Sequence, residues 1–313
     1  MLFLPIKADF PLPRWPVMTV VVCLICVGVF LLQQRDVREF IGAIERYCHK
    51  DRSRIELIVF ERIASMKRYE YCDDMMMDIV QNDNGAEVIE DIVTNLRPLA
   101  GFSHEDSKEY VRLMLKDEWR TFVNTVPEHP SRKFAYHTDS WNPWGMIRSA
   151  FAHGDWGHII GNLIFFFAFA ATVEALAGPV MFWAAILAIS IFTGIFSSVS
   201  AYATGNHLPT LGLSGVVMGM MGLFSALIPR GRVRCFYWFI VLFGTVAIPA
   251  WALTLWFVGM DTIKLFVVED HGFINVMAHV TGGIGGYLFG IAFMRKARER
   301  ARDLMFDIDM NTS

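Results

Sequence analysis

The segment Leu211-Gly-Leu-Ser-Gly215 places a serine between glycines just where an apolar run begins. A second segment, Ala278-His-Val-Thr-Gly282, places a histidine inside another apolar run of membrane length. A serine hydroxyl becomes a nucleophile when a base such as imidazole takes its proton. The two segments therefore predict a fold in which two membrane helices bring a serine and a histidine together.

The composition predicts an all-α polytopic membrane protein. Of the 313 residues, 54% are hydrophobic, and they gather in long runs without charged side chains. One run is too long for a single helix and breaks at residues 204–212, so we expect six membrane helices. The basic residues are too few and too scattered to indicate nucleic-acid binding. The charge-free runs cover residues 15–34, 156–173, 175–229, 235–260 and 271–294.

These runs divide the chain into five parts. The first run is not a cleaved signal peptide, because no small-x-small cleavage site follows it. Arginines in the short loops put both termini in the cytoplasm and the insert outside. The parts are a cytoplasmic N-terminus (1–14), membrane helix 1 (15–34), a soluble helical insert (35–143), a core of membrane helices 2 to 6 (144–294) and a basic cytoplasmic tail (295–313).

The cysteines are too few for a disulfide scaffold. Only Cys48 and Cys72 lie in the insert, whereas the other three lie in or beside apolar runs. A disulfide between these two is a hypothesis, and it would stabilise the insert by about 3 kcal/mol in the chain-entropy model. The insert itself is expected to be structural or to recruit substrates.

Three polar residues are expected at one depth in the membrane. Ser214, His279 and His158 each precede a charged residue on the cytoplasmic side by 16 residues. At a rise of 1.5 Å per residue, each lies roughly 24 Å above that side of a layer about 30 Å thick. A helix beginning near Leu213 is too short to span this layer, so the loop before it must dip into a wet cavity.

Ser214 would stand at a helix N-terminus, where free backbone N–H groups favour a developing anion. Gly-x-Ser-Gly alone is a weak signal, because small residues also serve helix packing in membranes. His279 favours catalysis, since an imidazole inside a membrane helix is costly; a hydrogen-bonded core histidine is the other interpretation. Glycines on one face of each helix would allow close approach, namely Gly215, Gly219 and Gly222, and Gly282, Gly286 and Gly290.

His158 and Asn162 are four residues apart, so they share one helix face, and both can donate to an anion. His153 precedes that helix, and holding the loop by hydrogen bonds is for this residue at least as good an interpretation as catalysis. We reject a metal site, because the sequence has no His-Glu-x-x-His pattern and no third ligand near these histidines.

A catalytic triad would need a buried carboxylate beside His279. Glu174 is expected at the opposite end of the bundle, and Asp261, Glu269 and Asp270 in an outer loop. The sequence therefore predicts a Ser-His dyad, with packing or a main-chain group orienting the imidazole.

The motifs resemble those of the rhomboid family of intramembrane serine proteases. The matches are His-x4-His-x3-Asn at 153–162, Gly-x-Ser-Gly at 212–215 and Ala-His-x-x-Gly-x3-Gly at 278–286. The resemblance covers residues 144–294 in order, spacing and six-helix layout. It implies transmembrane protein substrates with a helix-destabilised segment and a small residue before the scissile bond. It implies no metal or organic cofactor.

The resemblance also assigns roles to residues. Ser214 would be the nucleophile and His279 the general base. The oxyanion hole would come from His158, Asn162 and the amides of Leu213 and Ser214. Supporting residues would be His153, Gly212, Gly215, Met218 and Gly282.

Three features depart from the family's pattern. Trp144 is followed by Gly145 where the family commonly has an arginine, and Arg148 is the nearest one. Met218 stands where an aromatic residue commonly stacks on the catalytic histidine, and methionine packs less rigidly. The long insert after helix 1 is the third departure and bears on substrate choice.

An alternative to the protease is a catalytically weak or inactive rhomboid-like protein that binds membrane helices. A transporter is a more distant alternative, because the polar groups stop at one level instead of forming a path across the bilayer. The N-terminus lacks the character of a transit peptide. We therefore expect a bacterial plasma (inner) membrane, with the active site open to the periplasmic side.

Overall fold

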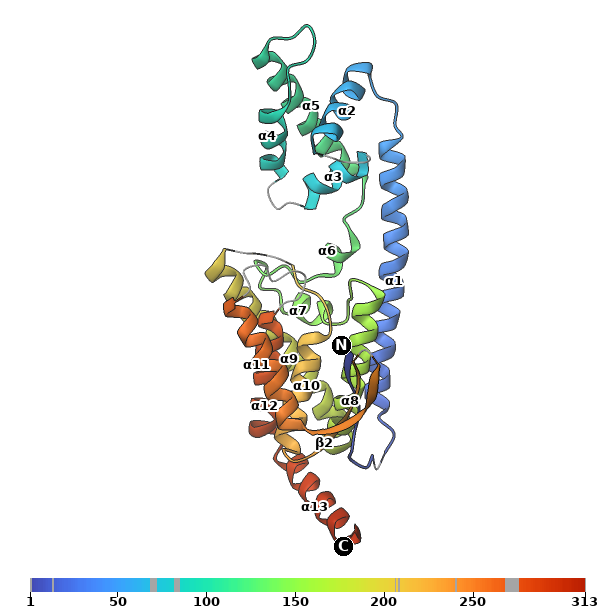
Figure 1. Cartoon of the computed structure of the whole chain (residues 1–313), viewed down its shortest axis with the longest axis vertical. Helices are drawn as coiled ribbons and strands as arrows, with labels where there is room; N and C mark the ends of the chain where they lie inside the picture. Colours follow the sequence, from blue (N-terminus) through green and yellow to red (C-terminus); the bar gives the residue numbers. More distant parts are fainter. Residues whose placement is uncertain are drawn as a thin grey trace. The chain divides into compact units, whose positions relative to one another are not determined.

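The computed structural model describes residues 2–12, 14–67, 72–81, 85–205, 207, 209–239, 241–267 and 276–312. The chain forms two compact units (Figure 1). The insert unit is Gln34–Pro130, and the membrane unit combines Met1–Gln33 with Ser131–Ser313. Residues 131–143, which the sequence analysis assigned to the insert, thus belong to the membrane unit.

The insert unit is helical and has its own apolar core. Large apolar side chains from its helices are fully buried in this core, such as Ile63, Met76, Ile92 and Leu115. A disulfide joins Cys48 to Cys72, so the hypothesised pair is formed. The helices are the second part of α1 (Val17–Cys48), α2 (Arg54–Lys67), α3 (Cys72–Gln81), α4 (Gly85–Asn95) and α5 (His104–Thr125).

The membrane unit contains the apolar helices. Within the described residues, α1, α8, α9 and α12 are long and apolar enough to cross a membrane, and α10 and α11 are shorter apolar helices. These helices indicate a multi-pass membrane protein. The helices that follow the insert are α6 (Pro130–Phe134), α7 (Pro143–Ser149), α8 (Trp156–Ala177), α9 (Pro179–Thr204), α10 (Ser214–Leu227), α11 (Ala250–Val267), α12 (Val276–Phe293) and α13 (Arg295–Thr312).

Helix 1 is longer than predicted. The first membrane helix was expected to end at residue 34, but α1 continues without a break to Cys48. The tail after residue 294 is helical, because α13 covers most of it. Arg300 of α13 donates to the backbone oxygen of Leu176 at 3.1 Å, which satisfies a carbonyl at the end of α8.

The expected fifth membrane helix over 235–260 is wrong in its first half. β2 (Arg232–Phe239) and β3 (Leu242–Pro249) form an antiparallel hairpin there, and β1 (Leu2–Ala8) pairs with the other side of β2. α11 begins only after Pro249. In the described residues the fold is therefore mostly helical with one three-stranded sheet, not all-α.

The residues of β2 explain why a strand forms. Aromatic and β-branched side chains favour extended backbone, and β2 is rich in them. Val233 and Cys235 are buried, whereas the alternating Arg232 and Arg234 are exposed, which is the two-residue period of a strand. An apolar run alone does not distinguish a strand from a helix.

α10 and α12 lie side by side with their backbones in contact (Figure 1). A methyl group on Gly282 would overlap the backbone oxygen of Gly215, and one on Gly286 would overlap that of Gly219. The glycine faces predicted from the sequence thus meet. This close approach brings the start of α10 and the start of α12, where Ser214 and His279 lie, to the same region.

Glu174 is buried near the end of α8 and binds the start of α1. Its Oε1 accepts from the Met18 amide at 2.9 Å, and its Oε2 accepts from the Thr19 amide at 2.7 Å and the Thr19 hydroxyl at 2.8 Å. The free N–H groups at a helix N-terminus stabilise a carboxylate, so this buried acid is a helix cap.

Candidate active site

Ser214 is the first residue of α10, and the chain before it is fixed by backbone contacts. Gly212 has φ of 122°, a conformation that favours glycine, and its amide donates to the Ser149 oxygen at 3.0 Å. Tyr136 and Thr210 exchange backbone hydrogen bonds of 2.7 and 2.9 Å. The loop that presents Ser214 is therefore tied at two points to the segment before α8.

His279 lies in the first turn of α12 and has a carboxylate partner. Its Nδ1 is 2.8 Å from Oδ2 of Asp261, and Asp261 is buried. The expectation that Asp261 lies in an outer loop is wrong, because α11 begins late and extends to Val267. The prediction that no carboxylate lies beside His279 is therefore also wrong. Glu269 and Asp270 lie outside the described residues.

The second ring nitrogen of His279 is free to act as a base. Its Nε2 is buried and has no hydrogen-bond partner among the residues described. An Asp261 carboxylate that accepts from Nδ1 places the ring proton there and leaves the lone pair on Nε2. The hydrogen bond from Ser214 to His279 is thus not formed in this structure; such bonds often tighten only when substrate binds.

His158 and Asn162 converge beside Gly212. A Cβ atom on Gly212 would lie 2.9 Å from Nε2 of His158 and 3.8 Å from Nδ2 of Asn162. The Nδ2 group of Asn162 is buried and has no partner in the described part of the chain. Asp155 caps α8 by accepting from the His158 amide at 2.8 Å, which fixes the start of this helix. An unpartnered buried donor next to the serine loop suits a developing anion.

His153 lies in the loop before α8 and holds backbone groups. The Leu213 amide points at its Nε2 at 3.5 Å, and its own amide donates to Oε1 of Gln33 at 3.0 Å. Burial, and then the neighbouring His158, lower the pKa of His153 to about 4, so the ring is neutral at pH 7. The Leu213 amide, predicted as an oxyanion donor, is directed at this ring in the present structure.

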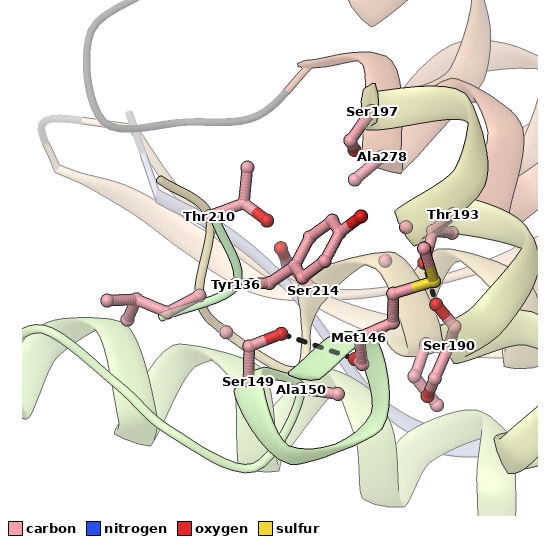
Figure 2. A pocket seen from close by; sticks show the side chains of 15 residues that line it. Tyr136, Met146, Ser149, Ala150, Ser190, Thr193, Ser197, Thr210, Ser214 and Ala278 are labelled. Atoms are coloured by element: carbon pink, nitrogen blue, oxygen red, sulfur yellow. Dashed lines mark hydrogen bonds between the residues drawn. The ribbon is translucent and has the colours of Figure 1, made fainter. Parts of the chain in front are cut away.

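A small cavity of about 40 Å³ adjoins Ser214 (Figure 2). Its walls come from α7, α9, α10 and α12 and from the segments around Tyr136 and Thr210. Many of the lining groups carry hydroxyls, namely Tyr136, Ser149, Ser190, Thr193, Ser197, Thr210 and Ser214.

The remaining predicted residues are placed as follows. Met218 is buried in α10, one turn after Ser214. A Cβ on Gly215 would lie 3.3 Å from the Ala278 oxygen, so the helices of the serine and the histidine touch there. Trp144 is exposed in α7, and Arg148 donates to the Lys133 oxygen at 3.0 Å.

The sequence analysis missed Asp261, Gln33 and Tyr136 as parts of this site. A lone acid that follows an apolar segment was the available signal for Asp261. Gln33 is the second-last residue of the first charge-free run, and Tyr136 stood in a segment assigned to the insert. Their contacts join positions far apart in the sequence, which periodicity does not reveal.

Comparison with known proteins points to one family. The family model for the Rhomboid domain matches residues 140–296. The human presenilin-associated rhomboid-like protein, mitochondrial, is 28% identical over 154 residues, which are 49% of this chain and 38% of that protein. RHOMBOID-like protein 12, mitochondrial, of Arabidopsis thaliana is 28% identical over 169 residues, 50% of this chain and 47% of that protein.

Rhomboid protein 1, mitochondrial, of Saccharomyces cerevisiae is 26% identical over 161 residues, 50% of this chain and 43% of that protein. The match thus covers less than half the length of each of these relatives. All three are mitochondrial proteins by name. The expected bacterial plasma membrane is therefore not supported.

Proposed function

Because the chain belongs to the rhomboid family, we propose that it is an intramembrane serine endopeptidase that cleaves transmembrane proteins. The observation that carries this proposal is the state of His279. One ring nitrogen binds a buried carboxylate, and the other is unpartnered within the described residues, on a helix in backbone contact with that of Ser214. This is the arrangement that a general base requires.

In the first step, Ser214 Oγ attacks the scissile carbonyl carbon and His279 Nε2 takes the hydroxyl proton. The oxyanion accepts hydrogen bonds from Asn162, His158 and the Ser214 amide. Collapse of the tetrahedral intermediate breaks the C–N bond, and His279 returns the proton to the leaving amine. Water then attacks the acyl-enzyme with the same base and frees Ser214.

Asp261 acts as a positioning residue in this scheme. It holds the proton of His279 on Nδ1 and stabilises the imidazolium that forms when Nε2 is protonated. The dyad predicted from the sequence is therefore replaced by a Ser-His-Asp arrangement. Its carboxylate comes from α11. This helix begins later in the sequence than predicted, because the β2–β3 hairpin precedes it.

The cavity beside Ser214 supports the expected substrate preference. Its volume of about 40 Å³ leaves room for a small side chain before the scissile bond. The same space would hold about three waters at roughly 10–15 Å³ each. Hydroxyl groups on its walls can keep such water for deacylation in an otherwise apolar bundle.

The alternative is a rhomboid-like protein that binds membrane helices without cutting them. The unformed hydrogen bond between Ser214 and His279 is the observation in its favour. The test is cleavage of model transmembrane substrates by purified protein in lipid, beside Ser214→Ala and His279→Ala. Cleavage by the wild type alone supports the protease. Folded wild-type protein that cuts none of several substrates supports the alternative.

Asp261→Asn tests the positioning role separately. We expect kcat to fall by at least about 10²-fold with KM little changed, because the amide cannot fix the tautomer or stabilise the imidazolium. Thr262→Ala is the matched control, since its hydroxyl donates only to the Val258 oxygen one turn back in the same helix. A wild-type kcat in Asp261→Asn would return the mechanism to a dyad.

The disulfide supports a location for the insert unit. Disulfides persist in oxidising compartments, so the insert would face the oxidising side of the membrane and both termini the other side. Protease treatment of sealed vesicles checks this topology. Cleavage of the insert from the same side as the C-terminal tail would exclude it.

A further inference from the structure

The end of α1, the segment that follows it and α5 carry a mostly buried charged cluster that the catalytic proposal does not use. Glu118 of α5 accepts from Lys50 at 2.8 Å and from the Tyr47 hydroxyl. The Arg52 guanidinium is 3.7 Å from the same carboxylate, and its side chain is only 4% exposed. Lys50 and Arg52 also lie close enough to the more exposed Glu56 carboxylate to lower its pKa, after the larger effect of the hydrogen bonds from Ser53.

Arg52 is held directly beside the disulfide. Its NH1 donates to the Cys48 oxygen at 2.7 Å, and its NH2 is 3.7 Å from Sγ of Cys72. The guanidinium also stacks 4.6 Å from the centre of the Phe60 ring. Its Nε is buried and lacks a hydrogen-bond partner among the residues that the structure describes. A rigid, incompletely satisfied cation therefore faces one sulfur of the pair.

From this geometry we propose that Cys48–Cys72 is a reducible site for thiol–disulfide exchange, with Cys72 as the leaving thiolate. A thiolate on Cys72 would lie directly beside the Arg52 guanidinium, whose positive charge would stabilise it. Cys72 is also the first residue of α3, where the helix dipole favours an anion. Asp73 and Asp74 in the same turn oppose that effect, so Arg52 is the deciding group.

The co-reactant would be a protein dithiol. One of its thiolates attacks Sγ of Cys48, the Sγ–Sγ bond breaks, and the electron pair leaves on Sγ of Cys72. The second thiol of the dithiol loses its proton and attacks the mixed disulfide, which releases Cys48. The dithiol is oxidised to a disulfide and this protein is reduced by two electrons. Both cysteines are partly exposed, so an attacking thiolate can reach them.

The first experiment measures Cys72 as a thiol in the full-length protein with Cys48→Ser. The rate of alkylation by iodoacetamide is followed against pH and read at Cys72 by mass spectrometry. We expect a midpoint below about 8.5, the ordinary value for a thiol. Arg52→Gln in the same background should raise the midpoint, and Arg52→Lys, which keeps the charge, should bring it back toward the starting value.

Arg112→Gln is the matched control, because this arginine pairs with Glu90 and Glu109 at the surface of the same unit. It should leave the midpoint unchanged. A midpoint at or above about 8.5 in the Cys48→Ser protein would overturn the proposal. An equal midpoint in Arg52→Gln, with α-helical circular dichroism retained, would also overturn it.

The second experiment establishes which sulfur is attacked. Wild-type protein is mixed with a two-cysteine oxidoreductase whose second cysteine is replaced by serine, so that the mixed disulfide is trapped. We expect the adduct on Cys48, and an equilibrium with dithiothreitol that moves about tenfold toward the disulfide in Arg52→Gln. An adduct on Cys72, or no adduct, would contradict the assignment of Cys72 as the leaving thiolate.

Discussion

The membrane unit and the insert unit differ in what lies between their helices. In the membrane unit, α10 and α12 touch through glycine backbones, such as Gly222 against Gly283 and Gly286 against Gly219. In the insert unit, large apolar side chains such as Ile63 and Met76 fill the interior. The insert adds a disulfide to that apolar core, and each unit buries carboxylates, such as Glu118 in the insert unit and Glu174 in the membrane unit.

The two environments account for this difference. Lipid tails are as apolar as leucine, so helices in a membrane gain little by burying large side chains and gain more by close backbone packing. In water, removal of apolar surface is the main driving force. The membrane unit should therefore be sensitive to added atoms, and the insert unit to removed cross-links and charges.

The largest effect is expected for Gly286→Ala. Its new methyl group would overlap the oxygen, carbon and Cα of Gly219 on the facing helix. Because backbone cannot swing aside, the cost should exceed the roughly 1–3 kcal/mol typical of side-chain overpacking. Thermal unfolding in detergent and substrate cleavage should both show loss of the folded bundle.

Gly259→Ala is the control for that experiment. Gly259 lies in α11 and has no atom within 4 Å of a built Cβ, so alanine should be neutral or slightly stabilising there. Equal unfolding temperatures for the two variants would mean that the backbone contact of α10 and α12 does not hold the unit together.

Removal of the disulfide should have the next largest effect, confined to the insert unit. Replacing Cys48 and Cys72 with serine should lower its free energy of unfolding by about 3 kcal/mol, because the unfolded chain gains freedom. Denaturant unfolding measured by hydrogen exchange separates the two units. In wild-type protein reduced with dithiothreitol, the free energy of unfolding of the insert unit should fall by less, since the Cys72 thiolate can then pair with Arg52. An equal loss would indicate that no such pair forms.

Loss of the buried carboxylate should come third. Glu118→Ala removes the carboxylate that binds Lys50, Arg52 and the Tyr47 hydroxyl, and leaves that hydroxyl only the backbone oxygen of the same residue at 2.9 Å. Breaking a fully buried pair costs several kcal/mol, but Lys50 is 33% exposed, so we expect about 2 kcal/mol. Glu109→Ala is the matched change, because its pair with Arg112 is at the surface. Equal unfolding free energies for Glu118→Ala and Glu109→Ala would contradict a stabilising role for the Glu118 cluster.

The comparison also explains what the sequence could predict. The facing glycines of α10 and α12 and the motifs around Ser214 and His279 are local patterns, so spacing alone located them. The disulfide followed from the presence of only two cysteines in a charged segment. These features depend on residues within a few turns of one another, or on simple elimination.

Other features depend on contacts that spacing does not encode. The run over 235–260 carries no charge, and its first half forms a hairpin whose first strand also pairs with β1, more than 200 residues earlier in the chain. Because the hairpin takes up the first half of the run, α11 begins later in the sequence than expected. Asp261 therefore lies in α11, beside His279. Glu118 is one of many charged residues in the insert, and its burial against Tyr47 and Arg52 is visible only in three dimensions.

The smallest effect is expected at the start of α2. The Ser53 amide donates to Oε2 of Glu56 at 2.6 Å, and the Glu56 amide donates to the Ser53 hydroxyl at 3.3 Å, which is a capping box. The hydrogen bonds from Ser53 hold the pKa of Glu56 below its usual 4.5. A lowered pKa means that the carboxylate stabilises the folded state above its usual titration range, and that this stabilisation is lost as pH falls through the lowered value.

Hydrogen exchange in the first turn of α2 should therefore speed up as the pH is lowered below about 4.5, after correction for intrinsic exchange. Glu56→Gln should remove this pH dependence, whereas Glu61→Gln, further along the same helix, should keep it. Ser53→Ala should cost about 1 kcal/mol or less at neutral pH, because it removes one cap on an exposed helix end. If Glu56→Gln kept the acid sensitivity, the capping carboxylate would not be its source.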